Sequence, residues 1–334
     1  MAKRKAISLM SGGLDSTLAT KIILDQGIEV IGLFLESPFG CKENVEEVAK
    51  HLGIKLRIVD KGMAFVELIR NPKYGYGKNI NPCIDCRIYM FHIAQRVMEE
   101  EGADFIITGE VLGQRPMSQR RDAMDIIDRD SETEGLILRP LSAKHNLPTL
   151  AETSGWVDRE KLLDIQGRSR SEQLKWAQSL ELKAYTAPGG GCLLTDVNFS
   201  ARLHQFFEQH ENPTMTEVRL LRYGRHFDLS DGSHLVIGRN AEENDHLQKI
   251  SKEDVAKDNM TLFRPYFSGP MAVLSGKNTP DAAILEEAAK LIANYAKKNL
   301  VDTQVIEVKR GETATRITVR FPPAAQTEAL PVLH

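Results

Sequence analysis

Two cysteines three residues apart are the first side chains in this sequence that could do chemistry. Cys83 and Cys86 lie in the segment NPCIDC, directly before a pattern typical of a helix. Both sulfurs of such a turn can face one point, and a helix N-terminus stabilises thiolates there. A third thiol, Cys192, follows three consecutive glycines. A redox pair and a set of metal ligands are both compatible with this pattern.

The spacing of the cysteines argues against a structural zinc site, which takes four protein ligands. No CxxC or HxxxH pair stands near Cys192 to complete one. Three cysteines could instead hold three irons of a [4Fe-4S] cluster and leave the fourth iron open to an external ligand. We expect Cys41 to lie outside the site. The nine histidines show no ligand spacing, so we expect them to be structural or surface residues.

A second group of residues forms the segment SGGLDS, residues 11–16, between an apolar strand pattern and an amphipathic helix pattern. Gly12 and Gly13 let the backbone approach a ligand closely, and Ser11 and Ser16 offer hydroxyls. The N-terminus of the following helix presents free N–H groups to an anion. We therefore predict a phosphate-binding loop. It is not the GxxxxGK[ST] loop of common NTPases, because no lysine follows the glycines.

The first half of the chain alternates short apolar runs with helical patterns. We expect strands at 6–10, 29–35, 55–59 and 104–108, and helices at 16–26, 42–52 and 86–100. Such alternation predicts right-handed βαβ units, and hence an α/β domain whose parallel sheet is covered by helices on both faces. The active site is then expected at the carboxyl ends of the strands.

The second half has an α+β pattern. After a helix at 166–182, the segment TAPGGG marks a boundary near residue 183. We expect a helix at 199–210, strands at 218–222, 226–229 and 234–238, a hairpin turn at Asp231-Gly232, a helix at 279–299 and hairpin strands at 304–308 and 315–321. The predicted domains are a catalytic domain at 1–182, a smaller α+β domain at 183–275, and a helix and hairpin at 276–334 that complete the second domain.

Composition limits the classes of partner. The formal net charge of −3 over 334 residues gives no global attraction to nucleic acid, so an RNA surface must be a local patch. The arginines that could form such patches are Arg115, Arg120, Arg121, Arg168, Arg170, Arg219, Arg222 and Arg225. No apolar run approaches the roughly 18 to 20 residues of a membrane span, and the start MAKRKAISLM lacks the apolar segment of a signal peptide. We expect a cytoplasmic protein without membrane contact.

The segment SGGLDS resembles the PP-loop of the ATP pyrophosphatases, which cleave ATP between its α and β phosphates and adenylate a substrate. Residues 108–114 (TGEVLGQ), with 118–119 (SQ) and 138–141 (LRPL), resemble the catalytic domain of tRNA 4-thiouridine synthetases, and NPCIDC is similar to a segment of the tRNA 2-thiouridylases. The 2-thiouridylases usually have a histidine where Glu110 stands, which favours 4-thiouridine. The resemblance, over about residues 6–195, implies a PP-loop fold of the adenine nucleotide alpha hydrolase-like kind.

The resemblance also implies roles for individual residues. Asp15 would position Mg²⁺ or the phosphates and take part in catalysis. The residues that would bind ATP are Ser11, Gly12, Gly13, Asp15, Ser16 and Gly109, and those that would bind the cluster and act in sulfur transfer are Cys83, Cys86 and Cys192. Residues 183–270 resemble the NFACT-R type of domain found in RNA-binding proteins. The better known 4-thiouridine synthetases carry a THUMP region ahead of the loop; because this loop begins at residue 11, we expect the second domain to hold the tRNA instead.

The expected function is therefore ATP-dependent thiolation of a tRNA uridine, with a base turned out of its stack. Sulfide, or a sulfur donor such as a cysteine desulfurase, would supply the sulfur, and a homodimer is compatible with the sequence. Four alternatives stay open: 2-thiouridine synthesis, a persulfide route on Cys86 and Cys192 without iron, a nucleotide-sensing RNA-binding protein, and a ligase that adenylates a small metabolite.

Overall fold

The computed structural model describes residues 4–40, 44–182, 185, 192–253, 260–276, 280–296 and 303–320. The chain divides into two compact units, Met1–Asp196 and Val197–His334. Cys41 and the glycine-rich segment 186–191 lie outside the described residues. The domain boundary expected near residue 183 falls beside that segment and stays a prediction. Among the helices of the described ranges, none is long and apolar enough to cross a membrane.

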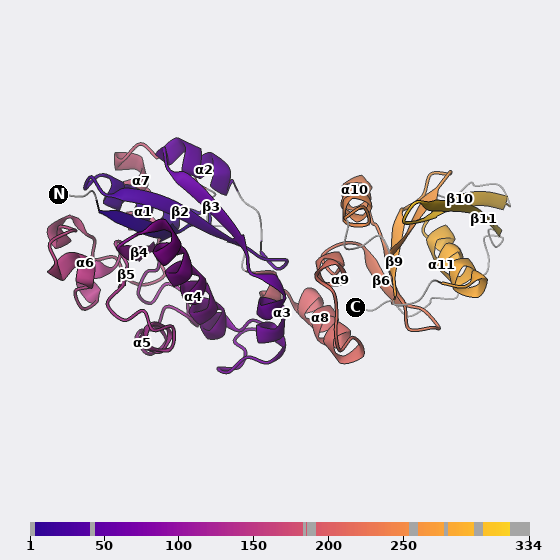
Figure 1. The fold of residues 1–334 in the computed structure, drawn as a ribbon, viewed down its shortest axis with the longest axis horizontal. Coiled ribbons are helices and arrows are strands. Elements are labelled where there is room, and N and C mark those ends of the chain that lie inside the picture. Colours follow the sequence, from indigo (N-terminus) through magenta and orange to yellow (C-terminus); the bar gives the residue numbers. More distant parts are fainter. Residues whose placement is uncertain are drawn as a thin grey trace. The chain divides into compact units, whose positions relative to one another are not determined.

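The first unit is built on a five-stranded parallel sheet with the order β3-β2-β1-β4-β5 (Figure 1). Its strands are β1 (Lys5–Leu9), β2 (Glu29–Glu36), β3 (Lys55–Asp60), β4 (Phe105–Thr108) and β5 (Ile137–Leu138). The predicted α/β fold is confirmed. The chain leaves β1 toward β2 on one side, and β4 lies on the other side, so a crevice opens at the carboxyl ends of β1 and β4.

Helices cover both faces of this sheet, and alternate strand residues face opposite layers. Ala6 and Val30 pack with α1 (Leu14–Leu24), whereas Ile7 and Ile31 belong to the core under α4 (Cys83–Glu101). The other helices of the unit are α2 (Val45–Leu52), α3 (Gly62–Arg70), α5 (Arg121–Asp130), α6 (Leu150–Thr153) and α7 (Ser171–Ser179), which is shorter than the helix expected at 166–182. Burial on both faces explains why the strands have apolar runs without polar alternation.

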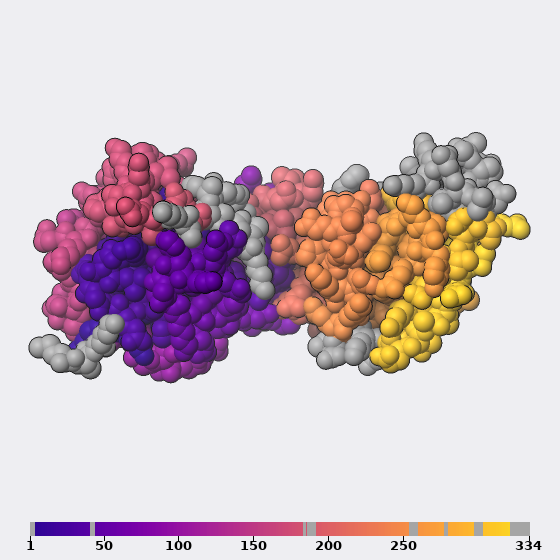
Figure 2. All heavy atoms as spheres, turned by 90° about the horizontal axis from the view of Figure 1, so that it is seen from above, coloured from indigo at the N-terminus to yellow at the C-terminus, as the bar shows by residue number. Residues whose placement is uncertain are grey.

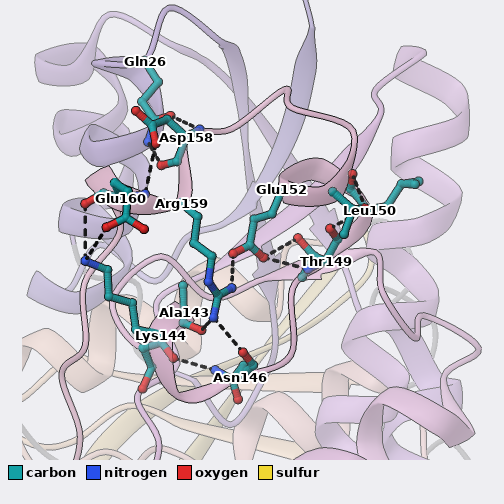
Figure 3. Close-up of polar contacts among 12 residues, drawn as sticks. Gln26, Ala143, Lys144, Asn146, Thr149, Leu150, Glu152, Asp158, Arg159 and Glu160 are labelled. Atoms are coloured by element: carbon teal, nitrogen blue, oxygen red, sulfur yellow. Dashed lines mark hydrogen bonds and ion pairs between the residues drawn. The ribbon is translucent and has the colours of Figure 1, made fainter.

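A polar network holds the segment after β5 (Figure 3). Arg159 donates to the Glu152 carboxylate and, at 3.0 Å, to the carbonyl of Ala143. Next to it, the Asp158 amide donates to Gln26 Oε1 at 2.8 Å. Because Gln26 follows α1, the Asp158–Gln26 bond ties the segment to the helix that begins at the predicted phosphate loop.

The second unit contains a six-stranded antiparallel sheet with the order β11-β10-β8-β9-β7-β6. Its elements are α8 (Val197–Gln209), α9 (Met215–Leu220), β6 (Arg225–Asp228), β7 (His234–Ile237), α10 (Ala241–Ile250), β8 (Met260–Pro265), β9 (Ala272–Ser275), α11 (Ala282–Asn294), β10 (Thr303–Arg310) and β11 (Thr313–Arg320). Helix α11 packs on one face, and α9 and α10 pack on the other. The hairpin of β10 and β11, coloured yellow, lies along one side of this unit (Figure 2).

The prediction of a strand at 218–222 is wrong, because 218–220 lie in α9 and 221–222 directly follow it. Thr214 and Glu217 form a capping box: the Thr214 hydroxyl accepts from the Glu217 amide at 3.2 Å, and Glu217 Oε2 accepts from the Thr214 amide at 2.8 Å. This T-x-x-E signal starts a helix and outweighs the short apolar pattern that follows it. The hairpin turn expected at Asp231-Gly232 is confirmed, since Gly232 has a φ of +80° between β6 and β7.

Candidate active site

The segment SGGLDS joins β1 to α1 at the crevice. Gly12 has a φ of +77°, a conformation that favours glycine, and Gly13 is the N-cap of α1. Ser16 Oγ donates to the Gly13 carbonyl at 3.1 Å and accepts from the Ser11 amide at 3.2 Å. The first amides of α1 have no acceptor within the helix, so they can bind an anion. The loop therefore has the geometry of a phosphate site.

Gly109 follows β4 and packs against the backbone of this loop. A Cβ atom at Gly109 would lie 2.5 Å from the carbonyl carbon of Asp15 and 2.5 Å from the amide nitrogen of Ser16. Any side chain at this position would therefore displace the first turn of α1. Gly109 provides the space in which the loop and the end of β4 meet.

Asp15 has one oxygen held by the protein and one without a hydrogen bond. Its Oδ2 accepts from Gln114 Nε2 at 2.7 Å and lies 3.5 Å from Arg170 Nε. Gln173 Nε2 in turn donates to Gln114 Oε1 at 2.8 Å, which orients the Gln114 amide. Oδ1 is buried and has no hydrogen-bond partner among the described atoms. Since Mg²⁺ prefers carboxylate oxygens together with phosphates, Asp15 fits the role of a magnesium ligand.

One cavity of about 420 Å³ connects the loop with the cysteines. The predicted site residues on its wall are Ser11, Asp15, Ser16, Cys83, Cys86, Gly109 and Cys192. Gly12 and Gly13 are not lining residues; they shape the loop behind Ser11 and Asp15. All of these residues belong to the first unit.

Two different segments place the three thiols. Cys83 and Cys86 occupy the first turn of α4, where the Cys86 amide donates to the Pro82 carbonyl at 2.8 Å. The segment of Cys192 is held through Thr195, whose carbonyl accepts from Asn79 Nδ2 at 2.7 Å. The fold thus brings together cysteines that are far apart in the sequence.

The environment keeps two of these thiols protonated. Cys192 is an exposed residue whose Sγ lies 3.9 Å from the carbonyl oxygen of Phe39. Desolvation raises the pKa of this thiol to about 11, and the neighbouring Cys86 and Cys83 add to the rise. Burial also raises the pKa of Cys83, and the neighbouring Cys86 adds to this effect. A ligand that needs thiolates must therefore displace these protons when it binds.

The raised pKa predicts how Cys192 reacts in the metal-free protein. Only the thiolate is alkylated by iodoacetamide, and below the pKa its fraction grows about tenfold for each pH unit. Between pH 8 and pH 10 we expect the alkylation rate of Cys192 to rise about 100-fold, against about fourfold for a cysteine with an ordinary pKa of about 8.5. Mass spectrometry of the labelled Cys192 peptide measures this ratio. A rate that levels off near pH 9 would contradict the assignment.

A lysine beside the second cysteine was not among the site residues predicted from the sequence. Lys61, which directly follows β3, is buried, and its Nζ donates to Cys86 Sγ at 3.4 Å and lies 4.1 Å from the centre of the Phe65 ring. Its position after a parallel strand was the available signal, because ligands bind at that edge of the sheet. An ammonium at this place can stabilise an anionic sulfur species held by the cysteines.

A buried ion-pair network supports a cationic wall of the cavity. Glu110 lies 3.3 Å from Arg87 Nε and 3.1 Å from Arg139 Nε, and Arg139 also donates to Asp128 at 2.6 and 2.8 Å. Burial alone would lower the pKa of Arg139, but the Asp128 hydrogen bonds and the Glu110 charge raise it above its usual range. Glu110 therefore stays paired and holds Arg87 on the wall of the cavity.

Several of the arginines that could face RNA also contact protein groups. Arg120 pairs with Asp122, Arg121 with Asn146, Arg170 with Asp15 and Arg219 with Glu253, while Arg225 packs over the Tyr295 ring. Arg115 lines the cavity, together with Lys78 and Arg87. Burial lowers the pKa of Arg115, and the positive charge of Arg87 lowers it further. Negatively charged phosphates in the cavity would relieve this repulsion.

Two separate segments of the chain match two different protein families. Residues 1–155 match the family described as "Thiamine biosynthesis protein (ThiI)". The first 155 residues are ThiI-like. Residues 224–330 match the "NFACT protein RNA binding domain", so the predicted resemblance of the second unit to an NFACT-R domain is confirmed. We refer to the unit Met1–Asp196 as the ThiI-like unit.

Curated relatives of the ThiI-like unit have two kinds of name. A "Probable tRNA sulfurtransferase" of Methanothermobacter thermautotrophicus is 30% identical over 33% of this chain and 30% of that protein, and one of Natranaerobius thermophilus is 32% identical over 46% of this chain and 39% of that protein. A "tRNA-specific 2-thiouridylase MnmA" of Nitratiruptor sp. is 33% identical over 32% of this chain and 34% of that protein. The chain thus spans about a third of the length of the relatives it matches.

A solved structure described as "Crystal structure of a 4-thiouridine synthetase - RNA complex with bound ATP" aligns with 54% of this chain and 52% of that chain. The sequence identity is 20% and the TM-score is 0.31. A score this low supports no conclusion about this chain, so the α/β fold rests on the sheet order of the ThiI-like unit itself.

Proposed function

We propose that the protein uses ATP to thiolate a uridine of tRNA. The observation that carries the proposal is the shared cavity, which is lined by Asp15 of the loop and by the three cysteines. Adenylation alone requires no thiols, whereas sulfur transfer to an adenylated base requires both groups in one place. The relatives named tRNA sulfurtransferase and 2-thiouridylase support the same class of substrate, and the RNA-binding family match supports an RNA partner.

The first half of the proposed reaction takes place on the loop. The amides at the start of α1 and the hydroxyls of Ser11 and Ser16 would bind the phosphates of ATP. Asp15 would hold Mg²⁺, which when bound balances the phosphate charge. The uridine carbonyl oxygen attacks the α-phosphorus, the bond to the β-phosphate breaks, and pyrophosphate leaves. Arg87 and Arg115 on the cavity wall stabilise the negative charge.

In the second half, sulfur replaces the activated oxygen. A sulfur nucleophile attacks the ring carbon, the carbon–oxygen bond breaks, and AMP leaves. Three cysteines that line one cavity fit a [4Fe-4S] cluster with three cysteine ligands, Cys83, Cys86 and Cys192. Bound there, such a cluster would have one iron that is not held by a cysteine, and this iron would be open to sulfide. Sulfide, free or from a donor such as a cysteine desulfurase, supplies the sulfur atom, and Lys61 lies where it can stabilise the anion.

A second route needs no iron and is favoured by the contact between Lys61 and Cys86. One of Cys86 and Cys192 carries a persulfide, whose outer sulfur attacks the ring carbon and expels AMP. The other cysteine then attacks the inner sulfur, which forms a disulfide and releases the thiouridine. An external thiol must reduce the disulfide before the next turnover. Cys83 is dispensable in this route.

We favour C4 as the position of the new sulfur. Glu110 stands where the 2-thiouridylases usually have histidine, and here it pairs with two arginines, Arg87 and Arg139. A histidine could not pair with both cations, so the cationic wall depends on the glutamate. Relatives of both kinds match this chain, and C2 therefore remains the alternative.

The test is the formation of AMP and pyrophosphate from ATP with and without tRNA, by protein reconstituted with iron and sulfide without oxygen. We expect tRNA to raise turnover at least tenfold, and mass spectrometry of the digested tRNA to show a thiouridine whose chromatographic position distinguishes C4 from C2. Asp15→Asn keeps an oxygen for the Gln114 hydrogen bond but loses its charge, so turnover should fall about 100-fold.

The two other outcomes each contradict the proposal. Turnover that is independent of tRNA would indicate a ligase for a small metabolite. Nucleotide binding with no turnover in any condition would indicate a nucleotide-sensing RNA-binding protein.

A further inference from the structure

Two histidines and one aspartate meet in the second unit. His210 directly follows α8, Asp228 ends β6 and His234 begins β7. One nitrogen of each imidazole and one carboxylate oxygen lie within 4.8 Å of one another. His234 is buried, His210 is partly buried and Asp228 is exposed, so solvent reaches one side of the cluster. Linear spacing did not reveal this group, because it joins the end of a helix to a hairpin.

The pairing of β6 with β7 explains why these side chains share a face. Asp228 and His234 are directly opposite in the antiparallel pair, and opposite residues point to the same side of a sheet. His226, two residues earlier on β6, points to that side too. Phe227 between them belongs to the core under α11. The face that carries Asp228 and His234 is covered by α8, because the ring centre of Phe206 on α8 lies 5.8 Å from that of His234.

The imidazoles are oriented by contacts already present. His234 Nδ1 lies 2.8 Å from Asp228 Oδ1, and His234 Nε2 lies 3.0 Å from His226 Nδ1. A histidine that binds a metal usually has its second ring nitrogen in a hydrogen bond, and His226 provides that partner. His210 stacks on Phe206, with ring centres 4.3 Å apart, and meets His234 edge to face at 6.0 Å.

The distances and charges suit a small divalent cation. Ligand atoms about 2.0 to 2.1 Å from a tetrahedral zinc ion lie about 3.3 Å from each other. The ligand atoms of this cluster lie within 4.8 Å of one another. Shifts of about 1 Å, which side-chain rotation provides, would therefore bring them to the separation that zinc requires. The carboxylate of Asp228 supplies a negative charge that balances part of the charge of a divalent cation.

A hydrogen-bond chain is the simplest alternative explanation of the cluster. Such a chain needs only His226, His234 and Asp228, whose contacts are all 3.0 Å or shorter. A metal site differs from such a chain in that it also includes His210, one nitrogen of which lies within 4.8 Å of the other two ligand atoms.

We propose that His210, Asp228 and His234 bind a zinc ion, which links the end of α8 to the β6–β7 hairpin. Two imidazole nitrogens and one carboxylate oxygen are ligands that Zn²⁺ accepts, and the exposed side leaves its fourth position to water. An ion that binds only the folded state adds to the stability of that state. The zinc ion therefore stabilises the second unit, and the site uses no residue of the ThiI-like unit.

The test must exclude the three thiols, which also bind zinc. It uses the full chain carrying Cys83→Ser, Cys86→Ser and Cys192→Ser, dialysed against zinc alone. We expect one zinc ion per chain and a rise of the Tm with zinc. Added to this background, His210→Gln and Asp228→Asn should each weaken zinc binding at least tenfold and remove the rise of the Tm.

The control variant is His204→Gln on α8, because His204 is an exposed imidazole that pairs with Glu208. It should bind zinc like the parent. Asp228→Asn can still accept the hydrogen bond from His234, and circular dichroism without zinc checks that each variant is folded. Visible absorption with cobalt in place of zinc gives a second readout that needs no ligand variant, and we expect the bands of a tetrahedral site without sulfur ligands.

Three results would overturn the inference. The first is a thiol-free chain that binds neither zinc nor cobalt. The second is zinc binding by the His210→Gln and Asp228→Asn variants that is as tight as in the parent. The third is loss of binding in His204→Gln, which would place the ion elsewhere on α8.

Discussion

Replacement of Cys83, Cys86 or Cys192 by alanine is expected to abolish sulfur transfer to tRNA while pyrophosphate release persists. In the proposed reaction, adenylation depends on the loop and Asp15, whereas sulfur delivery depends on the three thiols that line the same cavity. We expect each variant, purified without oxygen, to lose its iron and acid-labile sulfide and to form thiouridine at least 100-fold more slowly. Iron and sulfide analysis, visible absorption and nucleoside mass spectrometry measure these effects.

The fourth cysteine supplies the matched control. Cys41→Ala should keep both the iron and the thiolation activity. If Cys83→Ala thiolates tRNA at full rate in protein that holds no iron, the cluster is wrong and the persulfide route on Cys86 and Cys192 takes its place. If all three alanine variants instead lose pyrophosphate release, the two halves of the reaction are not separable in the way the cavity indicates.

Gly109→Ala is expected to destabilise the ThiI-like unit by about 3 kcal/mol and to weaken ATP binding at least tenfold. The new methyl group would lie 2.5 Å from backbone atoms of Asp15 and Ser16, and main chain cannot swing aside as a flexible side chain can. Overpacking of this kind forces backbone shifts, here in the first turn of α1. Denaturant unfolding and ATP titration measure the two effects.

Gly40→Ala is the control for this prediction, because a Cβ at Gly40 meets its nearest atom, the Ser37 carbonyl oxygen, at 3.8 Å, an ordinary contact. It should leave the stability within about 1 kcal/mol of the parent. A Gly109→Ala protein that is as stable as the parent and binds ATP normally would show that the end of β4 and the loop do not approach as closely as described.

The fold of the ThiI-like unit could be predicted because its signals are local. Apolar runs without polar alternation, separated by amphipathic stretches, indicate a parallel sheet whatever the distant contacts are. The strands β1, β2, β3 and β4 begin and end within one residue of the predicted ranges. The strand predicted at 218–222 from a short apolar run is wrong, because the capping box of Thr214 and Glu217, which is also a local signal, starts a helix there.

Part of the site was equally readable. The glycines, serines and aspartate of SGGLDS lie in one short segment, and their chemistry follows from their types and order. The cysteine pair in NPCIDC is local too. Cys192 was grouped with that pair because three cysteines suit a cluster with one open iron, since nothing near it in the sequence points to Cys83 or Cys86.

The remaining features depend on contacts between distant segments, which only the tertiary structure decides. Lys61 reaches Cys86 because β3 ends beside the start of α4, and Asp15 is oriented by Gln114, 99 residues further along the chain. His210 and His234 meet because α8 packs on the β6–β7 face. No periodicity encodes such pairs, because side chains separated along the chain approach only when packing of the apolar core brings their elements together. Local patterns therefore determined the sheet and the loop, and packing determined which lysine, amide and histidines stand beside them.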